Sequence, residues 1–293
     1  MRPDPFAFER PARYAVMGQP IAHSLSPRIH DLFGKSCGIP VQYEAIEVPA
    51  GGLAQAVSHF QALGGRGLNI TVPLKLEAAR ICDSLRPAAV RAGAANTLML
   101  GESIVGDNTD GAGLMADLLR LGAHPQGRRV LVLGAGGAVR GILGPLVVAQ
   151  PARLALFNRD EARGRQLLED LHGTLQGGVE LLTHKALGET PFDLVLNATA
   201  AGLSGSRPQL PGTIFARDSW AYDLMYGPHA RPFCDWAEES GAQVSDGLGM
   251  LIEQAAESFL LWHGVRPETA PVREQLQNQN TARSAGSLTG GLI

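Results

Sequence analysis

Apolar runs and helix-like periodicity alternate along the first part of the chain. Strands are expected at 14–18, 43–48 and 68–72, and helices at 26–33 and 53–63. A further helix is expected to open at Pro73, because proline suits the first helical position. Regular alternation of strands and helices predicts a mostly parallel sheet.

The pattern changes after Gly122, where a continuous apolar run at 129–133 predicts a strand in a sheet that is covered on both faces. An amphipathic helix is expected just before it, at 114–121. Further strands alternate with helical segments and are expected at 154–157, 179–183, 193–197, 221–224 and 243–244. This spacing predicts a Rossmann domain over residues 114–246.

A last helix is expected at 250–262, where Leu251, Ala255, Phe259 and Trp262 form an apolar stripe. Gln254 lies off that stripe, so it is either partly enclosed or a glutamine at the edge of the surface. Beyond Pro271 the chain is rich in Gln, Asn, Ser and Gly without periodicity. Residues 275–293 are therefore predicted to be a tail with little fixed structure.

Composition limits the classes of function. The chain has 293 residues, enough for two ordinary domains, and its net charge of −3 gives no broad basic field for nucleic acid or an anionic membrane. The three cysteines are far apart and form no CxxC motif, which indicates a reducing compartment and no metal site of that kind. Without a signal-peptide core or an apolar run of membrane-spanning length, a cytoplasmic protein is expected.

Lys75 is the first candidate for catalysis. It is expected in the first turn of the helix that follows Pro73, near the positive end of the helix dipole, where a cation is mildly disfavoured. Lys75 is either a solvated side chain or a group that exchanges a proton with a substrate. Asn108, Thr109 and Asp110 precede another helix, and three polar residues exceed what one cap needs. A carboxylate there could pair with a lysine and accept a hydrogen bond from a substrate hydroxyl.

Ser24 and Ser26 stand at the start of the helix that continues through Phe33. Two hydroxyls beside a helix N-terminus can hold a carboxylate without any arginine. The alternative is that Ser26, followed by Pro27, only caps the helix and that Ser24 is incidental.

A glycine-rich turn follows the apolar strand at 129–133 directly. Its sequence is Gly134-Ala135-Gly136-Gly137-Ala138-Val139-Arg140, between a strand and a helix, where backbone N–H groups can approach a pyrophosphate. Val139 occupies the third glycine position of the usual motif. Close packing of helix against strand is therefore expected to rest on Ala138 and Gly141.

The second strand of this domain ends at Asn158-Arg159-Asp160, about where such folds select between NAD and NADP. Arg159 and Arg163 favour the 2′-phosphate of NADP. Asp160 is ambiguous, because a carboxylate can repel a phosphate or accept a hydrogen bond from a free ribose.

Taken together, these segments resemble the shikimate dehydrogenase family over nearly the whole chain up to about Pro271. The matching segments are 18–27, 69–75, 93–98, 108–111, 134–140, 158–159 and 249–255. The resemblance implies an α/β fold with a substrate-binding domain at 1–113, which has a mostly parallel sheet, and an NADP-binding Rossmann domain at 114–246. C-terminal helices at 247–274 are expected to pack back on the first domain, and the tail follows them. It implies NADPH-dependent reduction of 3-dehydroshikimate to shikimate, a step in aromatic amino acid biosynthesis.

The resemblance also implies roles for individual residues. Lys75 and Asp110 would form the catalytic pair, and Ser24 and Ser26 would hold the substrate carboxylate. The expected ligands of the ring hydroxyls and the pocket-lining tyrosine are Thr71, Asn96, Gln254 and Tyr226. The expected cofactor residues are Gly134, Gly136, Gly137 and Ala138 at the pyrophosphate, Asn158, Arg159 and Arg163 at the adenine-ribose phosphate, and Thr199, Met225 and Gly247.

Three other functions share some of these sequence features. A quinate/shikimate dehydrogenase that prefers NAD is the nearest alternative, and Asp160 motivates it, because the family usually has threonine there. A dinucleotide-binding regulator without catalysis would lack the Lys75–Asp110 pair. A similar enzyme for another small substrate, such as a folate, fits the two serines poorly. The expected partner is a small-molecule substrate rather than nucleic acid or a membrane, and a homodimer is left open.

Overall fold

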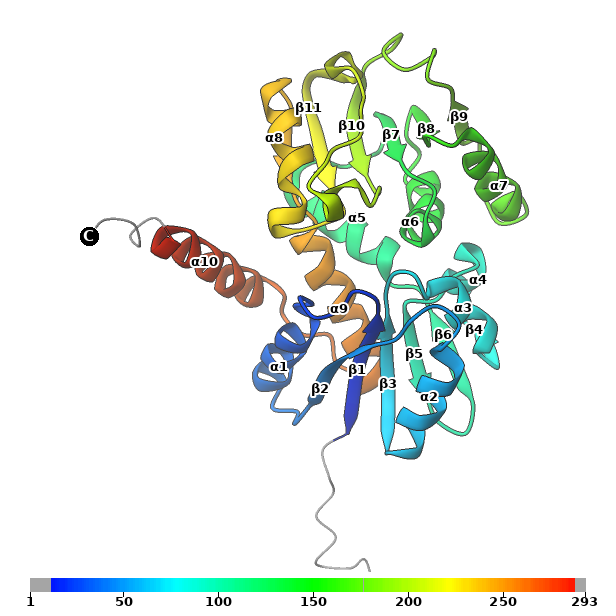
Figure 1. The fold of residues 1–293 in the computed structure, drawn as a ribbon, viewed down its shortest axis with the longest axis vertical. Helices are drawn as coiled ribbons and strands as arrows, with labels where there is room; N and C mark the ends of the chain where they lie inside the picture. Colours follow the sequence, from blue (N-terminus) through cyan, green and yellow to red (C-terminus); the bar gives the residue numbers. More distant parts are fainter. Residues whose placement is uncertain (1–11, 176, 288–293) are drawn as a thin grey trace, which may run out of the picture.

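Two six-stranded sheets make up the body of the protein (Figure 1). The computed structural model describes residues 12–175 and 177–287. The ends of the predicted first domain and of the predicted tail, 1–11 and 288–293, lie outside these ranges.

The N-terminal sheet has the strand order β2-β1-β3-β5-β6-β4. Strand β1 pairs in parallel with both neighbours, whereas β5 runs antiparallel to β3 and β6. Its strands are β1 (Arg13–Gly18), β2 (Gln42–Glu47), β3 (Gly65–Ile70), β4 (Ser84–Leu85), β5 (Thr97–Leu100) and β6 (Ile104–Asp107). Its helices are α1 (Ser26–Cys37), α2 (Leu53–Ala62), α3 (Lys75–Ile81) and α4 (Pro87–Ala92).

The second sheet is parallel throughout, with the order β12-β11-β10-β7-β8-β9. Its strands are β7 (Arg129–Leu133), β8 (Arg153–Phe157), β9 (Glu180–Leu182), β10 (Phe192–Asn197), β11 (Phe215–Asp223) and β12 (Gln243–Ser245). Its helices are α6 (Gly137–Val148), α7 (Glu161–Leu171) and α8 (Arg231–Glu239), with 3₁₀ turns at Ala201–Ser204, Gly212–Ile214 and Gly227–His229. The predicted Rossmann topology is confirmed.

Helices α5 (Asp110–Leu121) and α9 (Leu248–His263) pack closely together between the two sheets (Figure 1). Gly113 permits this approach, since an added Cβ would lie 2.7 Å from the backbone nitrogen of Gln254. Helix α9 then packs on α1, with Ile29, Phe33 and Phe259 in one buried cluster. The C-terminal helices thus return to the first domain, as expected. No helix in the described ranges is long and apolar enough to cross a membrane.

The predicted tail is wrong over most of its length, because helix α10 (Ala270–Ser287) continues through it (Figure 1). Val272 and Leu276 are one helical turn apart and are buried against the α1–α9 cluster. Two apolar anchors in a polar sequence are too few to give a periodic signal, but they fix the first turns of the helix on the body.

Two helix starts also differ from expectation. Helix α3 begins at Lys75 rather than Pro73, because a turn closed by a hydrogen bond from Leu74 N–H to the Thr71 carbonyl comes first. Helix α1 begins with Ser26 as a helical residue, and its N-cap is Leu25.

Candidate active site

Lys75 and Asp110 meet as a buried ion pair between two helix N-termini. The Lys75 Nζ lies 2.5 Å from the Asp110 Oδ2, and only 9% and 5% of the two side chains are exposed. Each is the first residue of its helix, α3 and α5. The dipole of α5 favours the carboxylate, whereas that of α3 disfavours the ammonium group, so the ion pair offsets the unfavourable position of the lysine.

Asn96 holds the other oxygen of the carboxylate. Its Nδ2 donates to Asp110 Oδ1 at 2.8 Å and to Thr109 Oγ1 at 3.0 Å, while its Oδ1 accepts from Thr109 N–H at 2.8 Å. Gln254 Oε1 lies 3.3 Å from both the Asn96 Nδ2 and the Thr109 Oγ1. Gln254 is 8% exposed, so it is an enclosed residue and not a surface-edge glutamine.

A second layer of buried polar groups, which the sequence did not point to, supports this network. Asn69 Nδ2 donates to Ser258 Oγ at 2.9 Å and to Thr97 Oγ1 at 3.2 Å, and Tyr43 donates to Asn69 Oδ1 at 2.7 Å. Burial raises the pKa of Tyr43 well above its usual value, which keeps it a donor. The only signal in the sequence was polar residues inside apolar strands and a helix.

The serine pair and Thr71 lie at the same edge of the first sheet, after the neighbouring parallel strands β1 and β3. Ser24 Oγ accepts from Ser26 N–H at 3.2 Å, so Ser24 holds the backbone at the start of α1. An added Cβ on Gly18 would lie 2.4 Å from the Thr71 methyl group, which shows how closely the two strand ends approach.

Tyr226 comes from the second domain and reaches the same place. It packs against the same buried cluster as Leu25, which lies between the two serines, and burial raises the pKa of the tyrosine. The structure thus brings together residues from both domains around Ser24 and Ser26.

The glycine turn lies directly beside the Lys75–Asp110 pair. An added Cβ on Gly137 would lie 3.5 Å from the Lys75 Cβ. Gly136 is the N-cap of α6, and Gly134 has a φ of +112°, a conformation that favours glycine. The pocket at this turn is lined by Leu76, Ala135, Gly136, Gly137, Arg140, Arg163, Gln166 and Leu167. The N–H groups of the first turn of α6 have no acceptor within the helix, so this turn can bind an anion.

Gly141 does not have the expected role. Its added Cβ would lie 2.6 Å from the Asn108 Oδ1 and 3.0 Å from the Asp110 Cβ, so it allows α6 to approach α5 rather than a strand. The helix–strand contact is made by Val139, which is fully buried in the core of the second domain. A side chain at the third glycine position is accommodated because it points into that core.

Asp160 has a local structural role that resolves part of its ambiguity. Its Oδ1 accepts from Arg163 N–H at 3.2 Å as the N-cap of α7, and the Asn158 Nδ2 donates to the Asp160 carbonyl at 2.8 Å. Arg159 and Arg163 are exposed, and Arg163 reaches the pocket at the glycine turn.

Substitutions at Asp160 distinguish the capping role of its side chain from the effect of its negative charge. Asp160→Thr retains a capping side chain, whereas Asp160→Ala is expected to lower the free energy of unfolding by about 1 kcal/mol. Both remove a carboxylate beside the two arginines, so the preference for NADP over NAD should rise roughly fivefold in both. Ratios of kcat/KM for the two cofactors, with chemical denaturation of each variant, measure both effects. An unchanged ratio would show that Asp160 acts only as a cap.

Three other predicted cofactor residues follow the last strands of the second sheet. Thr199 Oγ1 donates to Asn197 Oδ1 at 2.8 Å, Met225 N–H donates to Asp223 Oδ1 at 2.8 Å, and Gly247 N–H donates to the Met225 carbonyl at 2.8 Å. An added Cβ on Gly247 would lie 2.4 Å from the Leu224 carbonyl oxygen. These turns therefore pack tightly at the carboxyl edge of the sheet, where such folds bind dinucleotides.

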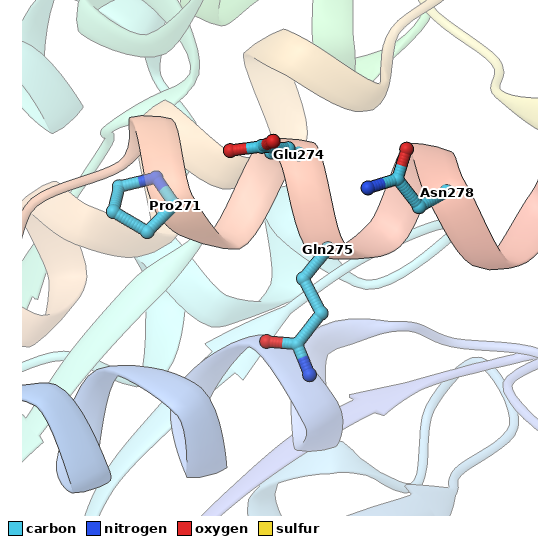
Figure 2. A pocket seen from close by; sticks show the side chains of 4 residues that line it. All are labelled: Pro271, Glu274, Gln275 and Asn278. Carbon is cyan, nitrogen blue, oxygen red and sulfur yellow. The ribbon is translucent and has the colours of Figure 1, made fainter.

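Another pocket lies along α10 (Figure 2) and is lined by Pro271, Glu274, Gln275 and Asn278. None of the predicted site residues lines it. Within residues 12–175 and 177–287, no group of three His, Cys, Asp or Glu side chains is placed to hold a metal ion.

Two family models match this chain, one in its N-terminal part and one near its C-terminal end. Residues 16–98 match the model of the shikimate dehydrogenase substrate binding domain, and residues 247–277 match that of the shikimate 5′-dehydrogenase C-terminal domain. These two matches contain Ser24, Thr71, Lys75, Asn96 and Gln254.

Relatives match over nearly their whole length. Shikimate dehydrogenase (NADP(+)) of Acidovorax sp. strain JS42 is 51% identical over 90% of this chain and 95% of its own, and that of Alkalilimnicola ehrlichii is 51% identical over 89% and 96%. Shikimate 5-dehydrogenase from Thermus thermophilus, in complex with NADP(H) and shikimate, is 33% identical with a TM-score of 0.79, over 91% of this chain and 99% of that one. The chain therefore belongs to the shikimate dehydrogenase family.

Proposed function

We propose that this protein is an NADP-dependent shikimate dehydrogenase, an oxidoreductase that reversibly reduces 3-dehydroshikimate to shikimate on the route to aromatic amino acids. The observation that carries the proposal is the buried Lys75–Asp110 pair, with Lys75 in contact range of the glycine turn at Gly137. Acid–base groups and a dinucleotide site in one place are what reduction of a ketone requires. A quinate/shikimate dehydrogenase that prefers NAD is less favoured, because the relatives above are named as NADP(+) enzymes.

The order of the strands fits a dinucleotide along the carboxyl edge of the second sheet. Arg159 and Arg163 follow β8, the glycine turn follows the next strand β7, and Thr199 and Met225 follow β10 and β11 beyond it. With the adenine-ribose phosphate at β8 and the pyrophosphate at the α6 N-terminus, Thr199 and Met225 after β10 and β11 would hold the nicotinamide half. When bound, the cofactor supplies the hydride.

The protein supplies the proton and the orientation of the substrate. In the reduction, Lys75 Nζ donates a proton to the oxygen that becomes the new hydroxyl, and in the reverse direction it accepts that proton. Asp110 holds the ammonium group in place, and Asn96 holds the carboxylate. Exclusion of water around this pair strengthens both interactions.

The substrate would lie between the pair and the two serines. Ser24 and Ser26 would bind its carboxylate, Thr71, Asn96 and Gln254 its hydroxyls, and Tyr226 would cover it from the second domain. Asn96 and Gln254 hydrogen-bond to each other and to Thr109, which supports their assignment to one group of ligands.

Initial rates with shikimate and with quinate, each with NADP and with NAD, test the proposal. We expect the shikimate–NADP pair to give the highest kcat/KM. A higher value for quinate with NAD would favour the alternative enzyme, and no turnover in any pair would contradict both. The cytoplasmic location and the homodimer also stay predictions, and analytical ultracentrifugation of the purified protein would test the second.

A further inference from the structure

Asn197 and Asp223 form a buried polar pair that the proposed reaction does not use. They are the last residues of the adjacent strands β10 and β11 and lie opposite each other in the ladder. Asn197 is 1% exposed and Asp223 is completely buried. The Asn197 Nδ2 donates to the Asp223 Oδ2 at 2.8 Å.

Each residue of the pair also holds the turn that follows its own strand. Asn197 Oδ1 accepts from Thr199 N–H at 3.2 Å and from Thr199 Oγ1 at 2.8 Å. Asp223 Oδ1 accepts from Met225 N–H at 2.8 Å, and the Met225 carbonyl in turn accepts from Gly247 N–H. The pair therefore links Thr199 and Met225, and through Met225 also Gly247, the three cofactor residues expected after the last strands of the sheet.

The aspartate is an unfavourable residue for stability in this place. Burial raises its pKa to about 7, and the Asp246 carboxylate nearby also acts to raise it. The Cys234 thiol of α8, which also faces Asp223, has a pKa raised to about 12 and so carries no charge. The hydrogen bonds that reach Asp223 come from an amide and a backbone N–H, not from a cation. Above pH 7 the folded protein thus contains a buried carboxylate without a cationic partner.

The geometry explains why an amide would not serve equally well. Two donors, the Asn197 Nδ2 and the Met225 N–H, point at separate oxygens of one side chain. A carboxylate can accept from both, whereas an amide offers one acceptor and places its own N–H₂ group against the other donor. We propose that Asn197 and Asp223 are a positioning pair that fixes Thr199 and Met225 for cofactor binding. The inference rests on the proposed assignment of those two residues to the cofactor.

Affinity for NADP⁺ without substrate, measured by isothermal titration calorimetry, tests the pair separately from turnover. Asp223→Asn leaves one donor unpaired and is expected to raise the Kd about tenfold or more. The double variant Asn197→Asp with Asp223→Asn exchanges the two side chains, so that every donor again faces an acceptor. Its Kd is expected to return to within about threefold of the wild type, since the net number of unpaired groups is again zero.

Asp193→Asn is the matched control, because Asp193 lies on the same strand but binds Arg129 near the opposite end. This variant is expected to keep the wild-type Kd.

Melting temperatures at pH 6 and pH 8 distinguish a positioning role of Asp223 from a general structural role. A group with a raised pKa stabilises the fold below its usual pKa, and that stability is lost as the pH rises through about 7. The melting temperature of Asp223→Asn, relative to that of the wild type, should therefore be higher at pH 8 than at pH 6. The variant should nevertheless bind the cofactor more weakly.

An unchanged Kd in Asp223→Asn would overturn the inference, and so would a folded double variant that binds as weakly as the single one. If the single variant does not fold, the Kd of the double variant is compared with that of the wild type, and a Kd about tenfold higher would overturn the inference. Failure of the wild-type protein to bind NADP⁺ would instead contradict the proposed function.

Discussion

Lys75→Ala should lower kcat by at least ~10²-fold and leave the Kd for NADP⁺ close to that of the wild type. Asp110 holds the ammonium group at 2.5 Å in the buried site, so removal of this group leaves the nascent alkoxide without that positioned acid. Alanine keeps the Cβ that lies beside the glycine turn, so the cofactor site keeps its contact with α3. Steady-state rates and calorimetric titration with NADP⁺ measure the two effects.

Lys35→Ala is the control for this variant. Lys35 also pairs with an aspartate, Asp31, at 2.6 Å, but the two side chains are 71% and 52% exposed, on the surface of α1. An exposed ion pair of this kind contributes little to stability, so both kcat and the melting temperature of Lys35→Ala should stay near the wild-type values. Turnover within a few fold of the wild type in Lys75→Ala would rule out the proton-transfer role.

Local patterns in the sequence were enough for the architecture of the second domain. The adjacent strands β7, β8 and β10 contain continuous apolar runs because both faces of the sheet are covered there, and the glycine turn stands directly between β7 and α6. Helix α10 was missed because Val272 and Leu276 act only through packing on α1 and α9. A tertiary contact of this kind leaves no periodic signal in a polar segment.

The sequence predicted the residues of the ion pair but not the buried polar residues that hold the pair in place. Lys75 and Asp110 were singled out at two helix starts 35 residues apart, and the structure joins them in one ion pair. Asn69 and Ser258, which are 189 residues apart, were not singled out, although they share a hydrogen bond behind that pair. A polar residue within an apolar strand shows that some buried partner exists, but only the fold shows which one.

Helix α6 fixes the position of Asp110 through a residue without a side chain. Gly141 is buried against the start of α5, where Asn108 Nδ2 donates to the Ala94 carbonyl at 3.0 Å and Asn108 Oδ1 accepts from Asp110 N–H at 3.1 Å. A methyl group on Gly141 would come within 2.6 Å of that Oδ1 and 3.0 Å of the Asp110 Cβ. Neither atom is the free end of a flexible chain, so the start of α5 must move, and Asp110 must move with it.

Gly141→Ala should therefore lower kcat by about 10²-fold, the effect expected when catalytic groups are displaced by about 1 Å. Gly144→Ala is the matched control, because Gly144 lies on the same helix with nothing within 4 Å of an added Cβ. That control should keep the wild-type kcat and unfold at a slightly higher temperature, since alanine favours a helix by roughly 0.5–1 kcal/mol over glycine. Binding of NADP⁺ by Gly141→Ala would show that its second domain is folded. Equal turnover in the two variants would mean that the helices separate without displacing Asp110, and that Gly141 has no part in positioning it.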